Sequence, residues 1–142
     1  MWCTGPKLPE AFPLAASWGF PKFATVLYCW NKTDKVGKSH LGTGCYTRSS
    51  LEYVLMFSRG KGHSSWVTNH SERQLINAQR LAHSVKPESI RERLCKFLSP
   101  PDNKRIELFA RTVPDSSYEC DAHGLELPNF FHPHQRENTS NL

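Results

Sequence analysis

The sequence contains no Cys-x-x-Cys pair, no long apolar run and no internal repeat. Its five cysteines are odd in number and widely spaced, at Cys3, Cys29, Cys45, Cys95 and Cys120. This spacing favours neither a disulfide framework nor a zinc site, so we expect free thiols in a reducing compartment. No export signal and no membrane-spanning stretch can be recognised, which predicts an intracellular protein, cytoplasmic or nuclear, with no membrane partner.

The length and composition are those of one small globular domain. The chain has 142 residues, enough for one core but not comfortably for two. Hydrophobic residues make up 38% and charged residues 22%, which excludes a disordered chain. A net charge of +5 favours a polyanionic partner such as nucleic acid, although ordinary solubility explains that charge equally well.

The hydrophobic pattern predicts strands that alternate with helices. Residues 8–18 have helical spacing, disturbed by Pro13, and a second helix is predicted from Pro87, as its first residue, to about Leu98. Three runs rich in apolar residues predict buried strands: "FATVLYCW", "LEYVLMFSRGK" and "RIELFAR". These elements indicate an α/β layered sheet.

The remaining segments are less regular. Residues 31–49 form a long polar loop, which in a small domain is usually functional or mobile. The segment "SSWVTNHS" suggests a short edge strand, and residues 70–86 have no clear pattern. Beyond Pro114 the chain is rich in turn residues. We expect a domain over residues 1–127 and a disordered tail over residues 128–142.

Several cationic side chains fall at predicted strand and helix ends. Lys86 stands alone before a helix, and Arg111 ends an apolar run. Lys32 and Arg59 also follow predicted strands. Because ligands of open α/β sheets bind outside the carboxyl ends of the strands, these charges suggest an anionic ligand along one rim.

Eight short segments of the chain, in one order, resemble those of a known family. They are Trp2-Cys3-Thr4-Gly5, Trp18-Gly19-Phe20, Trp30-Asn31-Lys32-Thr33, Gly42-x-Gly44-Cys45-Tyr46-x-Arg48, Glu52, Arg59-Gly60-Lys61, His83-Ser84-x-Lys86-Pro87-Glu88 and Glu107-Leu108-Phe109-Ala110-Arg111. Their order and spacing resemble the MT-A-seventy family of S-adenosylmethionine-dependent N6-adenine methyltransferases of RNA and DNA.

The resemblance implies an incomplete Rossmann-like methyltransferase sheet with flanking helices, which binds S-adenosylmethionine and an extruded adenine. By this resemblance Lys86 lies near the methionine part of the cofactor, where an ammonium would meet a carboxylate. Arg111 matches an arginine near the cofactor ribose, and Glu107 on the same strand is a further cofactor-binding candidate. A solvated lysine and a strand-end ion pair remain the alternatives for Lys86 and Glu107.

The resemblance also implies substrate-binding residues. Glu52 corresponds to a glutamate near the adenine pocket, and its place inside an apolar strand would be costly without a partner. A solvent-facing position is the alternative for Glu52. Lys32 and Arg48, with Arg59 and Lys61, suit nucleic-acid backbone contacts or a solvated loop. Tyr46, Trp30 and Trp66 are candidates for base stacking or for the core.

The chain departs from the family pattern in two places. The catalytic Asp-Pro-Pro-Trp signature of the family precedes the Trp-x-Thr-Gly segment, and here Met1 stands directly before Trp2, so we expect no catalytic residue within this chain. The Ser99-Pro100-Pro101-Asp102 turn lacks the aromatic fourth residue and is not a substitute. Downstream, Gly124 and Glu126 align with a ribose-binding segment, but Leu125 replaces its asparagine. The histidines His123, His132 and His134 form no metal-binding pattern.

Three functions therefore remain open. The chain is the portion of an N6-adenine methyltransferase downstream of the catalytic motif, which needs a complementing methyltransferase subunit. Alternatively, it is a non-catalytic nucleic-acid-binding partner subunit, or a truncated and inactive product. The target, DNA or RNA adenine, is not specified by the motifs.

Overall fold

The computed structural model describes residues 1–60, 66–82, 84–99, 105–111, 114, 120–124 and 127. The chain divides into two compact units, Met1–Ser99 and Pro100–Leu142, each described by itself. All five cysteines are free thiols.

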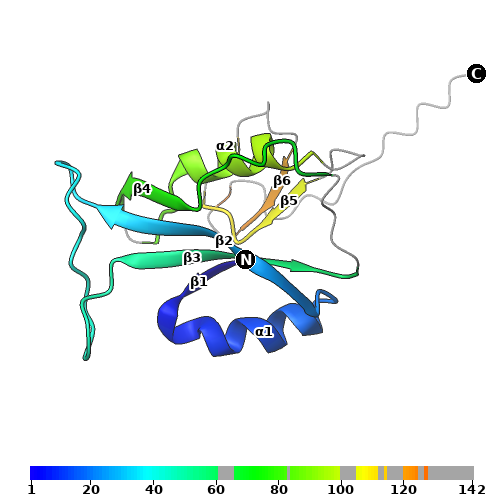
Figure 1. The fold of residues 1–142 in the computed structure, drawn as a ribbon, viewed down its shortest axis with the longest axis horizontal. Helices are drawn as coiled ribbons and strands as arrows, with labels where there is room; N and C mark the ends of the chain where they lie inside the picture. Colours follow the sequence, from blue (N-terminus) through cyan, green and yellow to red (C-terminus); the bar gives the residue numbers. More distant parts are fainter. Residues whose placement is uncertain are drawn as a thin grey trace, which may run out of the picture. The chain divides into compact units, whose positions relative to one another are not determined.

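The first unit is built on a four-stranded mixed sheet with the order β1-β3-β2-β4. Its strands are β1 (Trp2–Thr4), β3 (Leu51–Ser58), β2 (Lys22–Thr33) and β4 (Leu75–Gln79). β3 pairs antiparallel with both β1 and β2, whereas β4 pairs parallel with β2 (Figure 1). The predicted α/β class is confirmed: this small mixed sheet with flanking helices is consistent with a Rossmann-like methyltransferase fold.

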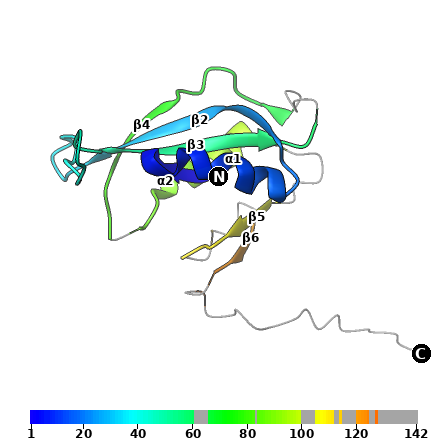
Figure 2. The same ribbon diagram turned by 90° about the horizontal axis from the view of Figure 1, so that it is seen from below.

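The two helices of this unit cover opposite faces of the sheet (Figures 1 and 2). The helix α1 (Leu8–Ser17) follows a short 3-10 turn at Gly5–Lys7, and α2 (Glu88–Phe97) follows β4. On β3, Leu55 packs in the cluster under α1, whereas its neighbour Val54 packs in the cluster under α2. Successive strand residues point to opposite faces, so each helix buries one side of β3.

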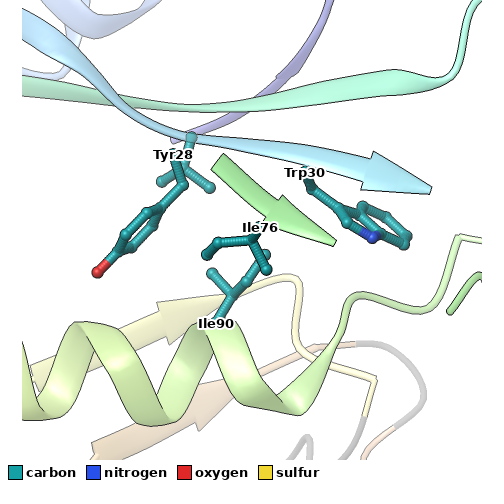
Figure 3. Packing of buried hydrophobic residues seen from close by; sticks show 5 residues of the cluster. Tyr28, Trp30, Ile76 and Ile90 are labelled. Atoms are coloured by element: carbon teal, nitrogen blue, oxygen red, sulfur yellow. The ribbon is translucent and has the colours of Figure 1, made fainter. Parts of the chain in front are cut away.

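The larger core cluster lies between β2, β4 and α2 (Figure 3). Tyr28 and Trp30 on β2 meet Ile76 on β4 and Ile90 on α2, and all four side chains are almost fully buried. The Tyr28 hydroxyl has no hydrogen-bond partner among the described residues. Burial, with the nearby Glu72 carboxylate, raises the pKa of Tyr28 to about 12.

Both predicted helices and the first two predicted strands are present, with shifted ends. β2 runs on to Thr33, past the predicted end at Trp30. Pro87 is the N-cap of α2, not its first helical residue, with an extended ψ of 128°. In the predicted edge strand, Val67 makes only an isolated bridge to Leu98.

The segment without a clear pattern contains β4. Its sequence Leu-Ile-Asn-Ala-Gln buries only Ile76, while Leu75 is 58% exposed. The strand forms because its backbone pairs in parallel with the end of β2, from Cys29–Leu75 to Thr33–Gln79. This pairing is non-local, so local propensity gives no sign of it.

The second unit contains a two-stranded parallel sheet of β5 (Arg105–Leu108) and β6 (Cys120–His123). β5 was predicted as a buried strand, but Ile106 is 62% exposed. β6 was not predicted, since its sequence Cys-Asp-Ala-His is only four residues long and contains no β-branched or aromatic residue. A Cβ on Gly124 would lie 1.9 Å from the Ala110 carbonyl oxygen, so this close approach requires glycine. The expected domain over 1–127 stays a prediction, and the tail lies outside the described residues.

Candidate functional site

Glu52 is the centre of a charged cluster in the first unit. Its carboxylate accepts from Lys32 at 2.7 Å with one oxygen and from Lys86 at 2.5 Å with the other. The residue is only 8% exposed, whereas the side chains of Lys32 and Lys86 are 21% and 35% exposed. The carboxylate is therefore buried with two ammonium partners that still reach solvent.

The three charges come from three parts of the fold. Glu52 lies near the start of β3, where it is paired with Thr4 on β1 and Trp30 on β2. Lys32 lies near the end of β2, and Lys86 lies in the connection between β4 and α2. The antiparallel register of β2 and β3 brings Lys32 close to Glu52. The connection that follows β4 brings Lys86 to the same carboxylate.

Two tryptophans lie beside these lysines, Trp30 against both and Trp2 against Lys86. Trp2 and Trp30 meet edge to face, with ring centroids 6.0 Å apart. The Lys32 ammonium lies 5.4 Å from the Trp30 ring, and the Lys86 ammonium lies 5.3 Å from Trp2 and 6.0 Å from Trp30. Trp30 is itself fixed by a hydrogen bond from its indole N–H to the Ala78 carbonyl at 2.9 Å. We call these five side chains the lysine–tryptophan cluster: Trp2, Trp30, Lys32, Glu52 and Lys86.

The cluster holds Glu52 in its ionised form. Burial of the carboxyl raises its pKa, but the hydrogen bonds from Lys32 and Lys86 and the charges of both lysines outweigh that effect. The pKa of Glu52 consequently lies below its ordinary value. Two cations and one anion leave one positive charge in excess at this place.

A pocket of about 340 Å³ opens beside the cluster, between β1 and α1. Its wall carries both Glu52 and Lys86. The other lining residues are Met1, Trp2, Cys3, Thr4, Lys7, Glu10, Ala11 and Leu14. The pocket therefore combines the apolar Ala11 and Leu14 and the charged Glu10 of α1 with charged groups from β3 and the β4–α2 connection.

The structure brings together three of the predicted site residues. Lys86, predicted from the resemblance to meet a cofactor, and Glu52 and Lys32, predicted to meet substrate, form one ion-paired group. The Glu52 carboxylate, which was expected to need a partner inside this strand, therefore has two partners, Lys32 and Lys86. Neither the ion pairs nor the contact between Trp2 and Trp30 could be read from the spacing of these residues.

Among the other predicted site residues of the first unit, Tyr46, Arg48 and Arg59 are exposed. Tyr46 is fully exposed and Arg48 is also exposed, both on the connection between β2 and β3. In this connection, a Cβ on Gly42 would lie 2.2 Å from the Ser49 carbonyl oxygen. The backbones at positions 42 and 49 therefore approach too closely for any residue but glycine at position 42. Arg59 lies over the Phe20 ring, while Lys61 falls outside the described residues. Trp30 belongs to the core, and Trp66 is half-buried.

Glu107 and Arg111 belong to the second unit. Glu107 lies on β5 and is half-buried, and the exposed Arg111 follows that strand. Their roles in cofactor binding, and their convergence with Lys86, stay predictions. Of the ribose-binding segment, Gly124 is described, whereas Leu125 and Glu126 are not.

A cluster of polar side chains near the ends of β2 and β4 was not predicted from the sequence. The Asn31 amide donates to Ser39 at 3.1 Å and to Asn77 at 2.8 Å. Nearby, Arg80 lies 3.0 Å from the His40 ring nitrogen. The parallel pairing of β2 with β4 brings these polar side chains side by side, and the sequence patterns did not predict that pairing.

Metal and membrane functions find no support in the described part of the chain. Within those ranges no group of three or more His, Cys, Asp or Glu side chains is placed to hold a metal ion. Nor is any helix among these residues long and apolar enough to cross a membrane.

The sheet with its helices, and the charged pocket beside it, agree with the motifs of one family. The sequence pattern that defines the MT-A70 (MT-A-seventy) family matches residues 1–121. The chain belongs to the MT-A70 family. It is similar to a Type II methyltransferase, M.MunI, of Mycoplasma sp, with 35% identity over 129 residues. The match covers 91% of this chain and 50% of that relative, so the chain spans about half the length of the curated relative it matches.

Proposed function

We propose that this chain forms part of an S-adenosylmethionine-dependent methyltransferase that modifies adenine N6 in nucleic acid. Membership of the MT-A70 family and the similarity to a methyltransferase support methyl transfer. The observation that carries the proposal is the lysine–tryptophan cluster at the lip of the pocket. It places the Lys86 ammonium in the wall of the pocket, where an anionic ligand group would be bound.

The pocket suits the cofactor in size and in charge. Its volume of about 340 Å³ falls within the range of small-molecule sites, which begins near 300 Å³. An ammonium has three N–H donors, and Lys86 uses one on Glu52 while its side chain is 35% exposed. Lys86 is therefore free to donate to the methionine carboxylate as well. S-adenosylmethionine supplies the methyl group when it is bound.

Glu52 has two roles in this proposal. It orients Lys32 and Lys86, and its remaining lone pairs offer an acceptor for the adenine amino group. Because its pKa is lowered, the carboxylate stays ionised and keeps this acceptor at neutral pH. Lys32 then lies at the substrate side of the cluster, with Tyr46 and Arg48 on the exposed connection available to nucleic acid. For Glu107 and Arg111, which belong to the second unit, cofactor binding stays a proposal from the family resemblance.

The experiment measures cofactor binding and methyl transfer separately. Calorimetry with S-adenosylmethionine is expected to give micromolar binding. Transfer to an adenine-containing oligonucleotide is then followed by mass spectrometry of the digested product, with and without a polypeptide that carries Asp-Pro-Pro-Trp. Nucleic-acid binding without any cofactor affinity would replace this proposal with the non-catalytic partner subunit. An aggregating chain with neither affinity would favour an inactive product.

A further inference from the structure

A group of partly exposed phenylalanines from α1, β2 and β3 lies outside the lysine–tryptophan cluster. Phe12, Phe23 and Phe57 are in mutual ring contact, with centroids 5.3, 5.7 and 5.5 Å apart. Phe12 is 45% exposed and Phe23 is 42% exposed. Rings that pack on one another yet keep almost half of their surface in water form a ready contact surface.

A fourth ring extends this surface under an arginine. The Arg59 guanidinium lies 4.6 Å from the Phe20 ring, and Phe20 is 37% exposed. The register of β2 and β3 joins the two parts, since Phe23 pairs with Phe57 and Lys22 pairs with Ser58, next to Arg59. Figure 1 shows the start of β2 and the end of β3 at the same end of the sheet. We call this surface the phenylalanine platform: Phe12, Phe20, Phe23 and Phe57.

The charged side chains in the two chain segments that carry the platform are all positive. Residues 12–26 and 53–60 contain Lys22 and Arg59 but no Asp or Glu. None of the ion pairs found among the described residues involves Lys22 or Arg59. Both side chains are exposed. Arg59 lies over the Phe20 ring, and Lys22 directly precedes Phe23 at the start of β2. The partner must therefore offer flat apolar groups together with negative charge.

We propose that the phenylalanine platform binds unpaired nucleotides of a nucleic-acid strand. Unstacked bases offer flat faces to the rings, while the phosphates that join them reach Lys22 and Arg59. A duplex fits poorly because its bases are stacked on one another and present only their edges. A second copy of this chain also fits poorly, because a twofold contact would bring Lys22 and Arg59 of both copies together.

This inference goes beyond the proposed function, since binding of an unpaired strand needs neither cofactor nor methyl transfer. If the platform does not bind single strands, the proposal for cofactor binding at Lys86 is unaffected. If the chain does not bind the cofactor, the proposal for the platform is unaffected. If both hold, the platform is a second contact that keeps an opened strand attached to the protein.

The test is fluorescence anisotropy with the full chain and three labelled probes, a thymidine oligonucleotide, a uridine oligonucleotide and a DNA duplex. The single strands are expected to bind more tightly than the duplex, and the two of them distinguish DNA from RNA. Phe23→Leu and Phe20→Leu keep the apolar bulk but remove the ring face, so each is expected to weaken single-strand binding roughly tenfold. Arg59→Gln is expected to reduce both the affinity and its salt dependence.

Two variants away from the platform and from the connection between β2 and β3 serve as matched controls. Lys96→Gln on α2 removes the same charge as Arg59→Gln, and Leu81→Ala shortens a side chain that is 52% exposed. Each is expected to change the affinity by less than about threefold. If a phenylalanine variant does not fold, photo-crosslinking of the wild-type chain to a bromouridine-containing oligonucleotide replaces it, with crosslinks expected within residues 12–23.

Three results would overturn the proposal. The first is equal affinity of the wild-type chain for duplex and single strands. The second is single-strand binding that survives both phenylalanine substitutions, or crosslinks confined to other regions. The third is a concentration-dependent dimer in sedimentation that Phe23→Leu abolishes, which would assign the platform to a second copy of this chain.

Discussion

The Glu52 carboxylate and the Lys86 ammonium are 2.5 Å apart although 34 positions separate them in the sequence. Lys32 occupies the other carboxylate oxygen, so Glu52 joins the end of β2 to the connection before α2. This ion-paired group closes one wall of the pocket. It fixes where two cations point, and it therefore links the stability of the fold to the proposed binding of ligand.

Removal of Glu52 should destabilise the fold. Glu52→Ala leaves two ammonium groups facing one another over a buried position, and we expect a loss of about 1–3 kcal/mol in the free energy of unfolding. Urea unfolding followed by circular dichroism measures this change. Glu10→Ala, which removes the exposed ion pair with Lys7, is the control and should stay within about 0.5 kcal/mol. A Glu52 variant as stable as that control would show that the buried pairs contribute nothing.

Stability should fall in acid because of the same carboxyl group. The pKa of Glu52 is lower in the folded chain than its ordinary value of 4.5. The unfolded chain therefore binds the proton more readily, and the contribution of Glu52 is complete above that value and disappears as pH falls through the folded-state pKa. Urea midpoints measured between pH 7 and pH 3 should decline less steeply for Glu52→Gln than for the wild type. Parallel curves would argue against a lowered pKa.

Lys86 should contribute to cofactor affinity. Lys86→Ala removes a charge-assisted hydrogen bond to the methionine carboxylate, which predicts a loss of roughly tenfold to a hundredfold in affinity for S-adenosylmethionine. Calorimetry gives the value directly. Lys38→Ala, a change of the same charge at an exposed position of the β2–β3 connection, is the matched control. Unchanged binding by Lys86→Ala would remove Lys86 from the site.

The buried hydroxyl of Tyr28 should lower the free energy of unfolding. Because it has no partner among the described residues, Tyr28→Phe deletes an unsatisfied polar atom while keeping the ring in the core. We expect the free energy of unfolding to rise by about 1 kcal/mol. Tyr46→Phe at a fully exposed position should have no effect. A marked loss of stability in Tyr28→Phe would reveal a hydrogen bond to this hydroxyl.

Glycine at position 42 should be required by the β2–β3 connection. The Gly42 amide donates to the Ser49 carbonyl at 3.1 Å, and a Cβ would lie 2.2 Å from the same oxygen. Loss of that bond, about 1 kcal/mol, should speed hydrogen exchange of the residue-42 amide roughly fivefold in Gly42→Ala. At Gly60 a Cβ would meet nothing within 4 Å, so Gly60→Ala is the control. Equal protection in both variants would contradict a steric requirement.

Much of the fold could be predicted from local patterns. The runs that form β2 and β3 are rich in β-branched and aromatic residues, and the spacing around Ile90 predicts the amphipathic α2. β4 and β6 could not be found in this way, since each is only four or five residues long, has few β-branched or aromatic residues, and is held by parallel pairing with another strand. Propensity over four or five residues is too weak to predict such pairing.

The sequence by itself determined the family and the order of the motifs, because those depend on which residues stand at which spacing along the chain. It also determined that Glu52, inside an apolar strand, needs a partner. Only the tertiary structure decided that the partners are Lys32 and Lys86, and that Trp30 lies against both lysines while Trp2 lies against Lys86. It also decided that phenylalanines from α1 and two strands share one surface. The physical reason is that strand register and the connection after β4 bring these side chains together. Their separation along the chain carries no information about their distance in space.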